Sequence, residues 1–200
     1  YVDLKRFFPS VESKASLRKK LDHRAWQKEG PIFFCLRRLV PRMGLNRLIE
    51  AAAWLKKKTE GRSSFNVIIG GEGPERDRLE ASTMDLRLED TVYFLGKIAE
   101  KELPLHYQAA DCFVLPTREL ECFGLPILES FACGTPVIAT PIGSIPEVLG
   151  PFSKISLTED TSPERIGKAM LEFLSAVPPP REKLSQYASN FDREKILSQL

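Results

Sequence analysis

The segment from Glu121 to Glu129 holds two carboxylates, with seven residues between them, on either side of Gly124-Leu125-Pro126. A glycine followed closely by proline is typical of a helix beginning, because proline is favoured in the first helical turn. The first backbone N–H groups of a helix lack helical partners, and with the helix dipole they form a site for an anion such as a diphosphate. Gly124, Leu125 and Pro126 are therefore candidate binding residues.

Glu129 lies one turn inside this predicted helix. A carboxylate in that position can accept two hydrogen bonds from a vicinal diol, such as the hydroxyls of a ribose. The alternative is a solvated glutamate that the positive end of the helix dipole favours. The local sequence does not choose between them.

Arg38 follows a short apolar run, Ile32–Leu36, at the other predicted wall of the site. Its forked donors match the oxygens of a phosphate. The alternative is an ion pair with a glutamate.

The elements that must position these residues alternate along the chain. Five short apolar runs rich in Val, Ile and Phe predict strands that are buried on both faces, as in a parallel sheet. They are Ile32–Leu36, Phe65–Ile69, Val92–Leu95, Cys112–Leu115 and Val137–Ala139. The helices expected between and after them are Leu45–Lys58, one opening at Pro74, Glu102–Ala109, Leu125–Cys133 and Pro163–Ala176. This alternation predicts an α/β fold, a Rossmann-like open parallel sheet with helices on both faces.

Loops rich in glycine and charge follow all five predicted strands, and ligands of such sheets bind beyond the carboxyl ends of the strands. We therefore expect one cleft along this edge. Its loops contain Arg37, Arg38 and Arg42, then Gly70–Gly73, Gly96–Ile98, Pro116–Gly124 and Thr140–Ser144. The turn Gly71-Glu72-Gly73 is not a dinucleotide fingerprint, since Arg76 stands where the third glycine is required. A tight turn before Pro74 explains it equally well.

Composition excludes several other classes of protein. A net charge of +2 over 200 residues is too small to suggest nucleic-acid binding by itself. No apolar run approaches the ~20 residues that a membrane span needs. The four cysteines form no CxxC pair, so reduced buried thiols are favoured over a zinc site. His23 and His106 are interpreted as ordinary residues rather than ligands or bases.

Taken together, these pieces resemble the C-terminal domain of the group 1 (family 4) glycosyltransferases, retaining enzymes of the GT-B fold. Each piece is weak alone, but their order and their places at strand ends make the set specific. The matching pieces are Val2–Phe7, Arg38-Leu39-Val40-Pro41 with Gly44, Gly71–Pro74, Val92–Gly96, Ala110-Asp111 with Pro116-Thr117, Glu121–Glu129 as Glu-x7-Glu, Gly134–Val137 and Pro146-Glu147.

The resemblance implies a role for each site residue. Glu129 would hold the ribose hydroxyls of a nucleotide-sugar donor, and Glu121 would contact hydroxyls of the donor sugar. Arg38 and the N–H groups of Leu125 and its neighbours would hold the diphosphate, and Glu121 and Arg38 are the catalytic candidates. The backbone near Lys97 and Ile98 would frame the base. The remaining expected donor contacts are Arg42, Gly71, Gly73, Phe123, Gly124 and Pro126.

It also implies the reaction. A hexosyltransferase of this kind moves a sugar from a UDP-, GDP- or ADP-sugar to an acceptor hydroxyl of a glycan, lipid or polysaccharide, with retention of configuration. It usually needs no metal or other cofactor, in agreement with the lack of any Asp-x-Asp in the sequence. The implied localisation is cytoplasmic, or peripheral on the inner face of the membrane.

The implied organisation has three parts: an interdomain connector at residues 1–12, a nucleotide-sugar-binding Rossmann-like domain at 13–177, and a helical tail at 178–200. The first residues, without Met, suggest a cut in the connector. The tail follows Pro178–Pro180, with short helices expected at Glu182–Ala188 and Asp192–Leu200. An N-terminal acceptor domain would be the missing partner, so these residues alone should bind nucleotide weakly and transfer little or nothing.

Three departures from the family pattern keep alternatives open. Met43 stands where most members have a phosphate-binding lysine, although Arg42 could replace it; Cys122 and Ser144 replace glycines. The alternatives are a non-catalytic nucleotide-binding module and a nucleotide-sugar epimerase relative, against which the Glu-x7-Glu spacing argues. The basic stretch Lys14–Lys28 is interpreted as an amphipathic helix with its leucines inward rather than a nucleic-acid site, and its charged face could also contact an anionic membrane.

Overall fold

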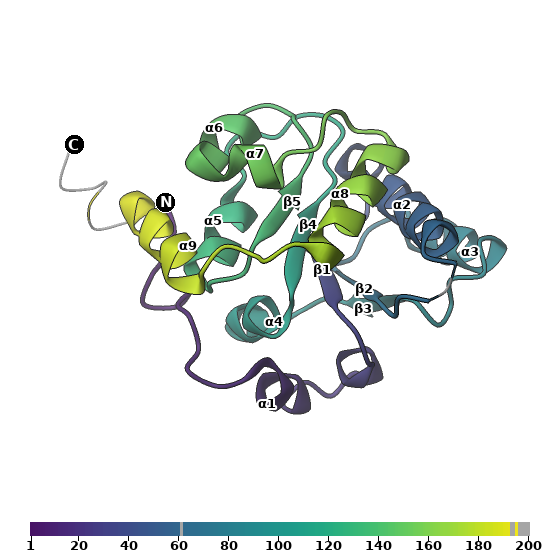
Figure 1. The fold of residues 1–200 in the computed structure, drawn as a ribbon, viewed down its shortest axis with the longest axis horizontal. Helices are drawn as coiled ribbons and strands as arrows, with labels where there is room; N and C mark the ends of the chain where they lie inside the picture. The colour runs from purple at the N-terminus through teal and green to yellow at the C-terminus, as the bar shows by residue number, and fades with distance from the viewer. Residues whose placement is uncertain (61, 193–194, 196–200) are drawn as a thin grey trace.

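Five parallel strands form a single twisted sheet in the computed structural model, which describes residues 1–60, 62–192 and 195 (Figure 1). The spatial order of the strands is β3-β2-β1-β4-β5. They are β1 Ile32–Leu36, β2 Asn66–Gly70, β3 Val92–Gly96, β4 Cys112–Leu115 and β5 Val137–Ala139. The chain therefore builds outward from β1 to β3 and then returns to build β4 and β5 on the other side of β1.

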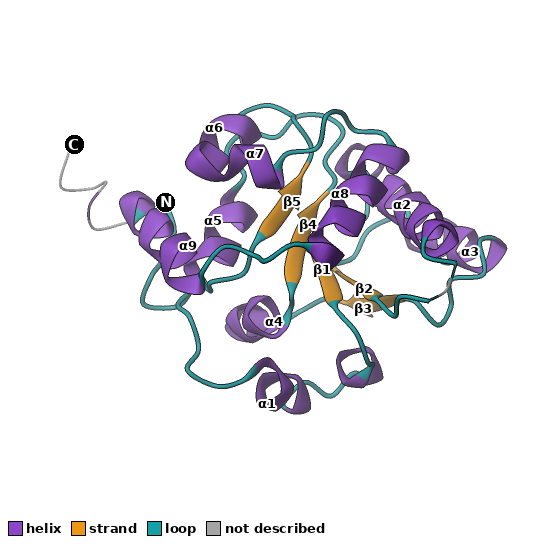
Figure 2. Cartoon of the chain, viewed as in Figure 1, coloured by secondary structure: helices purple, strands orange, loops and turns teal. Residues whose placement is uncertain are grey.

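Helices follow the strands and pack on both faces of the sheet (Figure 2). They are α1 Lys14–Lys19, α2 Leu45–Lys58, α3 Arg76–Asp85, α4 Leu103–Ala109, α5 Leu125–Ala132, α6 Ile145–Leu149, α7 Ser153–Ser156, α8 Pro163–Ser175 and α9 Arg181–Ala188. None of the helices in the described part of the chain is both long and apolar enough to cross a bilayer.

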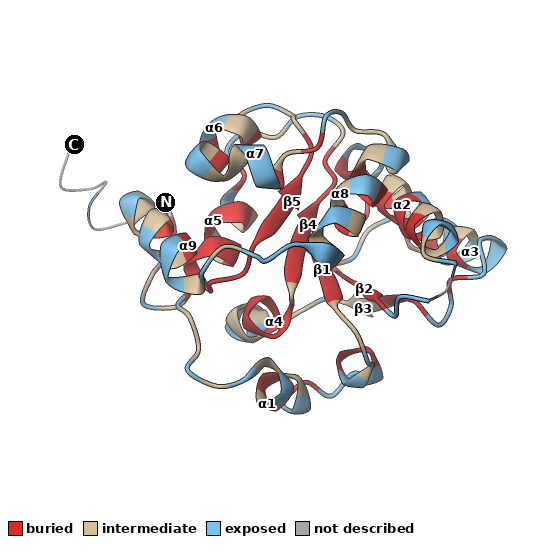
Figure 3. Ribbon diagram, viewed as in Figure 1, coloured by how far each residue is buried: buried red, intermediate tan, exposed pale blue. Residues whose placement is uncertain are grey.

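The two faces of the sheet carry separate hydrophobic clusters, because successive side chains of a strand point to opposite faces. Phe33 and Cys35 of β1 pack with α2 and α8, whereas Ile32 and Phe34 pack with α4 and α5. Figure 3 shows the strands as the most continuously buried part of the molecule. This two-sided burial is the reason that the strands read as unbroken apolar runs, and it confirms the predicted α/β sheet.

Several predicted boundaries need correction. The helix expected to open at Pro74 begins at Arg76, because the Glu75 N–H donates to the carbonyl of Leu39 at 3.1 Å and so pins the turn to the loop after β1. A 3₁₀ turn, Glu100–Glu102, precedes α4, which starts at Leu103 with proline in its first turn. The sequence pattern does not predict the short helices α6 and α7.

The basic stretch Lys14–Lys28 is also not one helix. It forms α1 and then a 3₁₀ turn, Arg24–Gln27, that begins where the Nδ1 atom of His23 accepts from the Ala25 N–H at 3.2 Å. Leu17 and Leu21 are buried, as predicted. In the tail, Glu182–Ala188 lies within α9, while most of the helix expected at 192–200 lies outside the described residues.

The cysteines are free thiols, and three of them are buried. Burial raises the pKa of the Cys35 thiol to about 12, so it stays protonated. Within the described ranges no cluster of three or more His, Cys, Asp or Glu side chains is arranged to hold a metal ion.

Candidate functional site

The order of the strands reverses between β1 and β4, and the helices that follow these two strands, α2 and α5, pack on opposite faces of the sheet. In open parallel sheets this switch point is where ligands bind. We call residues 37–44 the β1 loop and residues 116–124 the β4 loop. They are joined across the switch point by a backbone hydrogen bond of 2.8 Å from the Arg118 N–H to the carbonyl of Arg42. The candidate site lies over this junction.

Helix α5 starts at the end of the β4 loop. Gly124 caps it in the left-handed conformation, with φ at 66°, and proline follows in the first turn, as predicted. The Gly124 N–H donates to Oε1 of Glu121 at 3.2 Å. The side chains of Phe123 and Leu125 beside it are exposed. The carboxylate of Glu121 therefore already accepts a hydrogen bond at the N-terminal end of α5, where a ligand anion would also bind.

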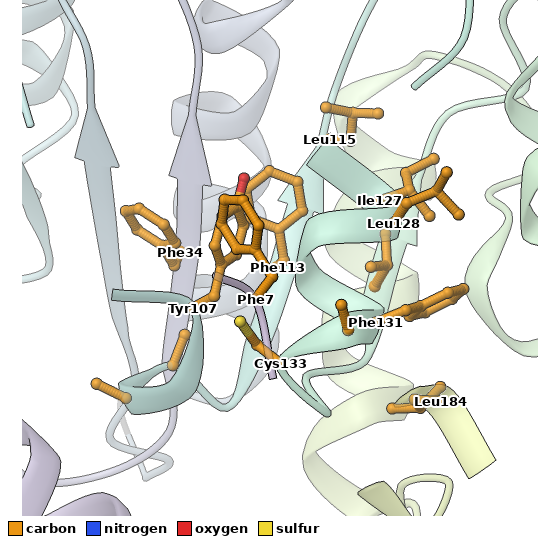
Figure 4. Close-up of a cluster of buried hydrophobic side chains, with 14 of the residues drawn as sticks. Phe7, Phe34, Tyr107, Phe113, Leu115, Ile127, Leu128, Phe131, Cys133 and Leu184 are labelled. Atoms are coloured by element: carbon orange, nitrogen blue, oxygen red, sulfur yellow. The ribbon is translucent and has the colours of Figure 1, made fainter. Parts of the chain in front are cut away.

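Glu129 is held by an aromatic residue from the neighbouring helix. The hydroxyl of Tyr107 in α4 donates to Oε2 of Glu129 at 2.9 Å. Burial raises the pKa of Glu129, and the Tyr107 hydrogen bond opposes part of that rise. Tyr107 itself is fixed, because its ring packs against Phe7, Phe34 and Phe113 (Figure 4). This contact orients one carboxylate oxygen and leaves Oε1 of Glu129 without a hydrogen bond inside the described chain.

The two arginines at the end of β1 point to different surroundings. Arg38 is exposed, as expected of a ligand-binding residue. The ion pair with a glutamate that was the alternative for Arg38 is formed by its neighbour Arg37. Arg37 reaches across the switch point to Glu121, and its Nη2 also donates to the hydroxyl of Thr117 at 3.0 Å. The sequence pattern places Arg37 at the cleft but assigns it no role. Residue types do not separate Arg37 from Arg38, because both follow β1 directly and both faces of this sheet are buried.

Met43 and Arg42 of the β1 loop also lie in different surroundings. Met43 is buried, with 8% of its surface exposed. Arg42 is exposed, and its Nη1 donates to the carbonyl of Leu120 at 3.1 Å. Arg42 therefore lies beside the β4 loop, at the same edge of the sheet.

Gly71 and Gly73 sit directly against the backbone of the β1 loop. A Cβ atom on Gly71 would be 1.9 Å from the carbonyl oxygen of Arg37, and one on Gly73 would be 2.3 Å from that of Leu39. Gly71 also has φ at 119°, which side chains rarely permit. These glycines bring the loop after β2 close enough to support the arginines, so a packing role accounts for both.

Lys97 and Ile98 follow β3 and line a pocket of about 230 Å³. Trp26 and His106 also line it, on the side of α4. Burial lowers the pKa of His106 to about 4, so the imidazole is neutral at physiological pH. The loop after β3 is linked to the others through a 2.7 Å hydrogen bond from the Gly71 N–H to the carbonyl of Gly96.

A chain of contacts therefore runs from the end of β3 through Gly71, Arg37 and Glu121 to the start of α5. The sequence matches the family Glycosyl transferases group 1 over residues 18–191. This chain belongs to that family.

Known proteins resemble this group 1 glycosyl transferase in sequence and in fold. The chain is 38% identical over 117 residues to a GDP-mannose-dependent alpha-(1-6)-phosphatidylinositol monomannoside mannosyltransferase of Mycobacterium tuberculosis, a match that covers 58% of the chain and 29% of the relative. It superposes on sucrose-phosphate synthase from Thermosynechococcus elongatus with a TM-score of 0.81 and 27% identity, covering 99% of the chain and 49% of the synthase.

A third match is of similar size to the chain. The C-terminal domain of a group 1 family glycosyl transferase from Francisella tularensis has a TM-score of 0.73 and 28% identity, with 95% of each chain covered. The glycosyl transferase described here thus spans about half of the synthase and about as much sequence as that C-terminal domain. The predicted family and its GT-B fold are confirmed.

Proposed function

We propose that this group 1 glycosyl transferase moves a hexosyl group from a nucleoside diphosphate sugar to an acceptor hydroxyl, with retention at the anomeric carbon. The described domain would hold the donor. The observation that carries the proposal is Glu129, a half-buried carboxylate. One of its oxygens is fixed by Tyr107, while the other has no partner among the described residues. A raised pKa and a preset orientation are hallmarks of a functional carboxylate rather than a solvated one.

The other residues of the site match the diphosphate, the sugar and the base of a donor. Arg38 is exposed at the end of β1, and the first turn of α5 lies across the switch point from it. A guanidinium and a helix N-terminus on opposite sides match a diphosphate. In this proposal Arg38 and Arg42 neutralise the departing diphosphate without a bound metal, Glu121 and the backbone near Phe123 contact the sugar, and the loop of Lys97 and Ile98 frames the base.

GDP-mannose is the first donor to test, since the mycobacterial relative is named as GDP-mannose-dependent. The acceptor hydroxyl, of a glycan or a lipid, would be bound by a second domain, because the relatives extend well beyond the matched region. The structure gives little support to membrane contact through Lys14–Lys28. Lys14 and Arg18 of that stretch form ion pairs with Asp111, which leaves Lys19 and Arg24 as exposed basic residues for such a contact.

One observation favours a second function, a nucleotide-binding module without transfer. Met43 is buried where the family pattern has a lysine, and Glu121 is already paired with Arg37. Such a module would bind nucleotide through Glu129 and fail to turn over any donor.

Isothermal titration calorimetry of the full-length protein with GDP-mannose, UDP-glucose and ADP-glucose tests the proposal. One donor should bind, and Glu129→Ala should weaken it about 10- to 100-fold, because hydrogen bonds to a carboxylate are lost. Glu50→Ala, at an exposed carboxylate of α2, is the matched control and should leave affinity unchanged. Unchanged binding in both Glu129→Ala and Arg38→Ala would contradict the assigned site.

A transfer assay then separates the two functions. Release of nucleoside diphosphate with formation of a product of the donor's own anomeric configuration, read by NMR, supports the transferase. Tight donor binding with no product in the presence of glycan and lipid acceptors would support the module.

A further inference from the structure

Arg37 and Glu121 form the most enclosed ion pair among the described residues, with 8% and 11% of their side chains exposed. Arg37 extends from the end of β1, and Glu121 belongs to the β4 loop. The pair therefore joins the β1 loop to the β4 loop at the switch point. A buried ion pair needs good geometry and further hydrogen bonds, because these must offset the free-energy cost of removing both charges from water.

The hydrogen bonds around Glu121 use almost all of its accepting capacity. Its Oε2 accepts from Nη2 of Arg37 and from the Thr117 hydroxyl, the latter at 3.2 Å. Its Oε1 accepts from the Gly124 N–H. Each carboxylate oxygen accepts about two hydrogen bonds, so Oε2 is filled and Oε1 has one lone pair left. That lone pair is the single position from which Glu121 can accept a ligand hydroxyl while this network is intact.

One donor of the Arg37 guanidinium is left unsatisfied. Its Nε is buried and has no hydrogen-bond partner, although the side chain is more than nine-tenths enclosed. An unsatisfied buried donor opposes folding, so the residue is poorly explained by stability alone. Its neighbour Arg38 is exposed. The two consecutive arginines thus lie in different places: Arg37 is inside the protein and Arg38 is at its surface.

We propose that Arg37 is a positioning residue for the sugar moiety of the donor. It holds the Glu121 carboxylate, with Thr117, in the one orientation that presents the remaining lone pair of Oε1 to a sugar hydroxyl. This inference rests on the proposed function. It assigns sugar recognition to Arg37 acting through Glu121, and diphosphate recognition to Arg38 acting directly.

The test compares each nucleotide with its sugar conjugate on the full-length protein. Calorimetry is run with GDP and GDP-mannose, and with UDP and UDP-glucose, on the wild type, Arg37→Ala and Arg38→Ala. The pair that the wild type binds more tightly is used for the comparison. Arg37→Ala should weaken the nucleotide-sugar about tenfold or more and leave the nucleoside diphosphate unchanged. Arg38→Ala should weaken both ligands alike, and Arg37→Lys should restore part of the affinity for the sugar conjugate.

A double-mutant cycle identifies the route of the effect. If Arg37 acts through Glu121, the Arg37→Ala/Glu121→Gln variant should bind nucleotide-sugar no more weakly than Glu121→Gln alone. Thr117→Val, at a fully buried position of the same network, should reproduce the sugar-specific loss even if Arg37→Ala does not fold. Thermal unfolding of each variant shows which ones fold.

Two results would overturn the inference alone. One is an equal loss of nucleotide and nucleotide-sugar affinity in Arg37→Ala, which would make Arg37 a diphosphate ligand. The other is additivity of the Arg37 and Glu121 effects. Wild-type protein that binds none of these four ligands, and neither ADP nor ADP-glucose, would instead refute the proposed function, and this inference with it.

Discussion

Replacing Gly71 with alanine tests whether the loops of the site are held together by close backbone contact. The φ of 119° at Gly71 costs a residue with a side chain about 1–3 kcal/mol. The new Cβ would also lie 1.9 Å from the Arg37 carbonyl oxygen, and relief of such overpacking costs about 1–3 kcal/mol more. We therefore expect Gly71→Ala to lower the free energy of unfolding by about 2–6 kcal/mol.

Gly96 supplies the matched control. Its φ is 73°, also left-handed, but no atom lies within 4 Å of a Cβ built there. Gly96→Ala should cost about 1–2 kcal/mol from backbone strain alone. For a domain of this size 1 kcal/mol is roughly 2–4 °C of Tm, so we expect a loss of about 10 °C for Gly71→Ala and about 4 °C for Gly96→Ala. Differential scanning calorimetry gives both values, and equal losses would refute the close contact with the β1 loop.

Two further predictions concern pH. Burial lowers the pKa of His106 to about 4 from its ordinary 6.5, so the unfolded chain gains this proton first and stability falls as pH decreases through that window. The loss between pH 7 and pH 5 should be about 2 kcal/mol and disappear in His106→Phe, as urea unfolding at both pH values would show; an unchanged acid slope would exclude His106 as its source. Burial raises the pKa of Glu129, so the folded state binds that proton more tightly than the unfolded chain and loses stability as pH rises above its ordinary 4.5. Glu129→Gln should therefore raise Tm at pH 7 while weakening donor binding, and a fall in Tm would show that the carboxylate is net stabilising.

Most of the fold can be predicted from the sequence, because its strands are buried on both faces. A strand such as Cys112–Leu115 contains no polar residue that would interrupt its apolar run, and its predicted bounds agree with β4. Short helices are harder to predict from the sequence. Ile145–Leu149 is only five residues long, and its apolar positions do not repeat often enough to reveal a helical period.

The site was predicted less completely, because its contacts join residues that are distant in sequence. Tyr107 and Glu129 meet only because α4 and α5 lie side by side on one face of the sheet. The pairing of Arg37 rather than Arg38 depends on how β1 twists at its end, which residue types do not disclose.

We propose that the switch point between β1 and β4 holds a nucleoside diphosphate with its ribose on Glu129. A crystal structure of the full-length protein with the nucleotide that most raises its Tm tests this directly. We expect the two ribose hydroxyls within hydrogen-bonding distance of the Glu129 carboxylate, and the diphosphate between Arg38 and the first turn of α5. A nucleotide bound elsewhere, or a ribose without contact to Glu129, would contradict it.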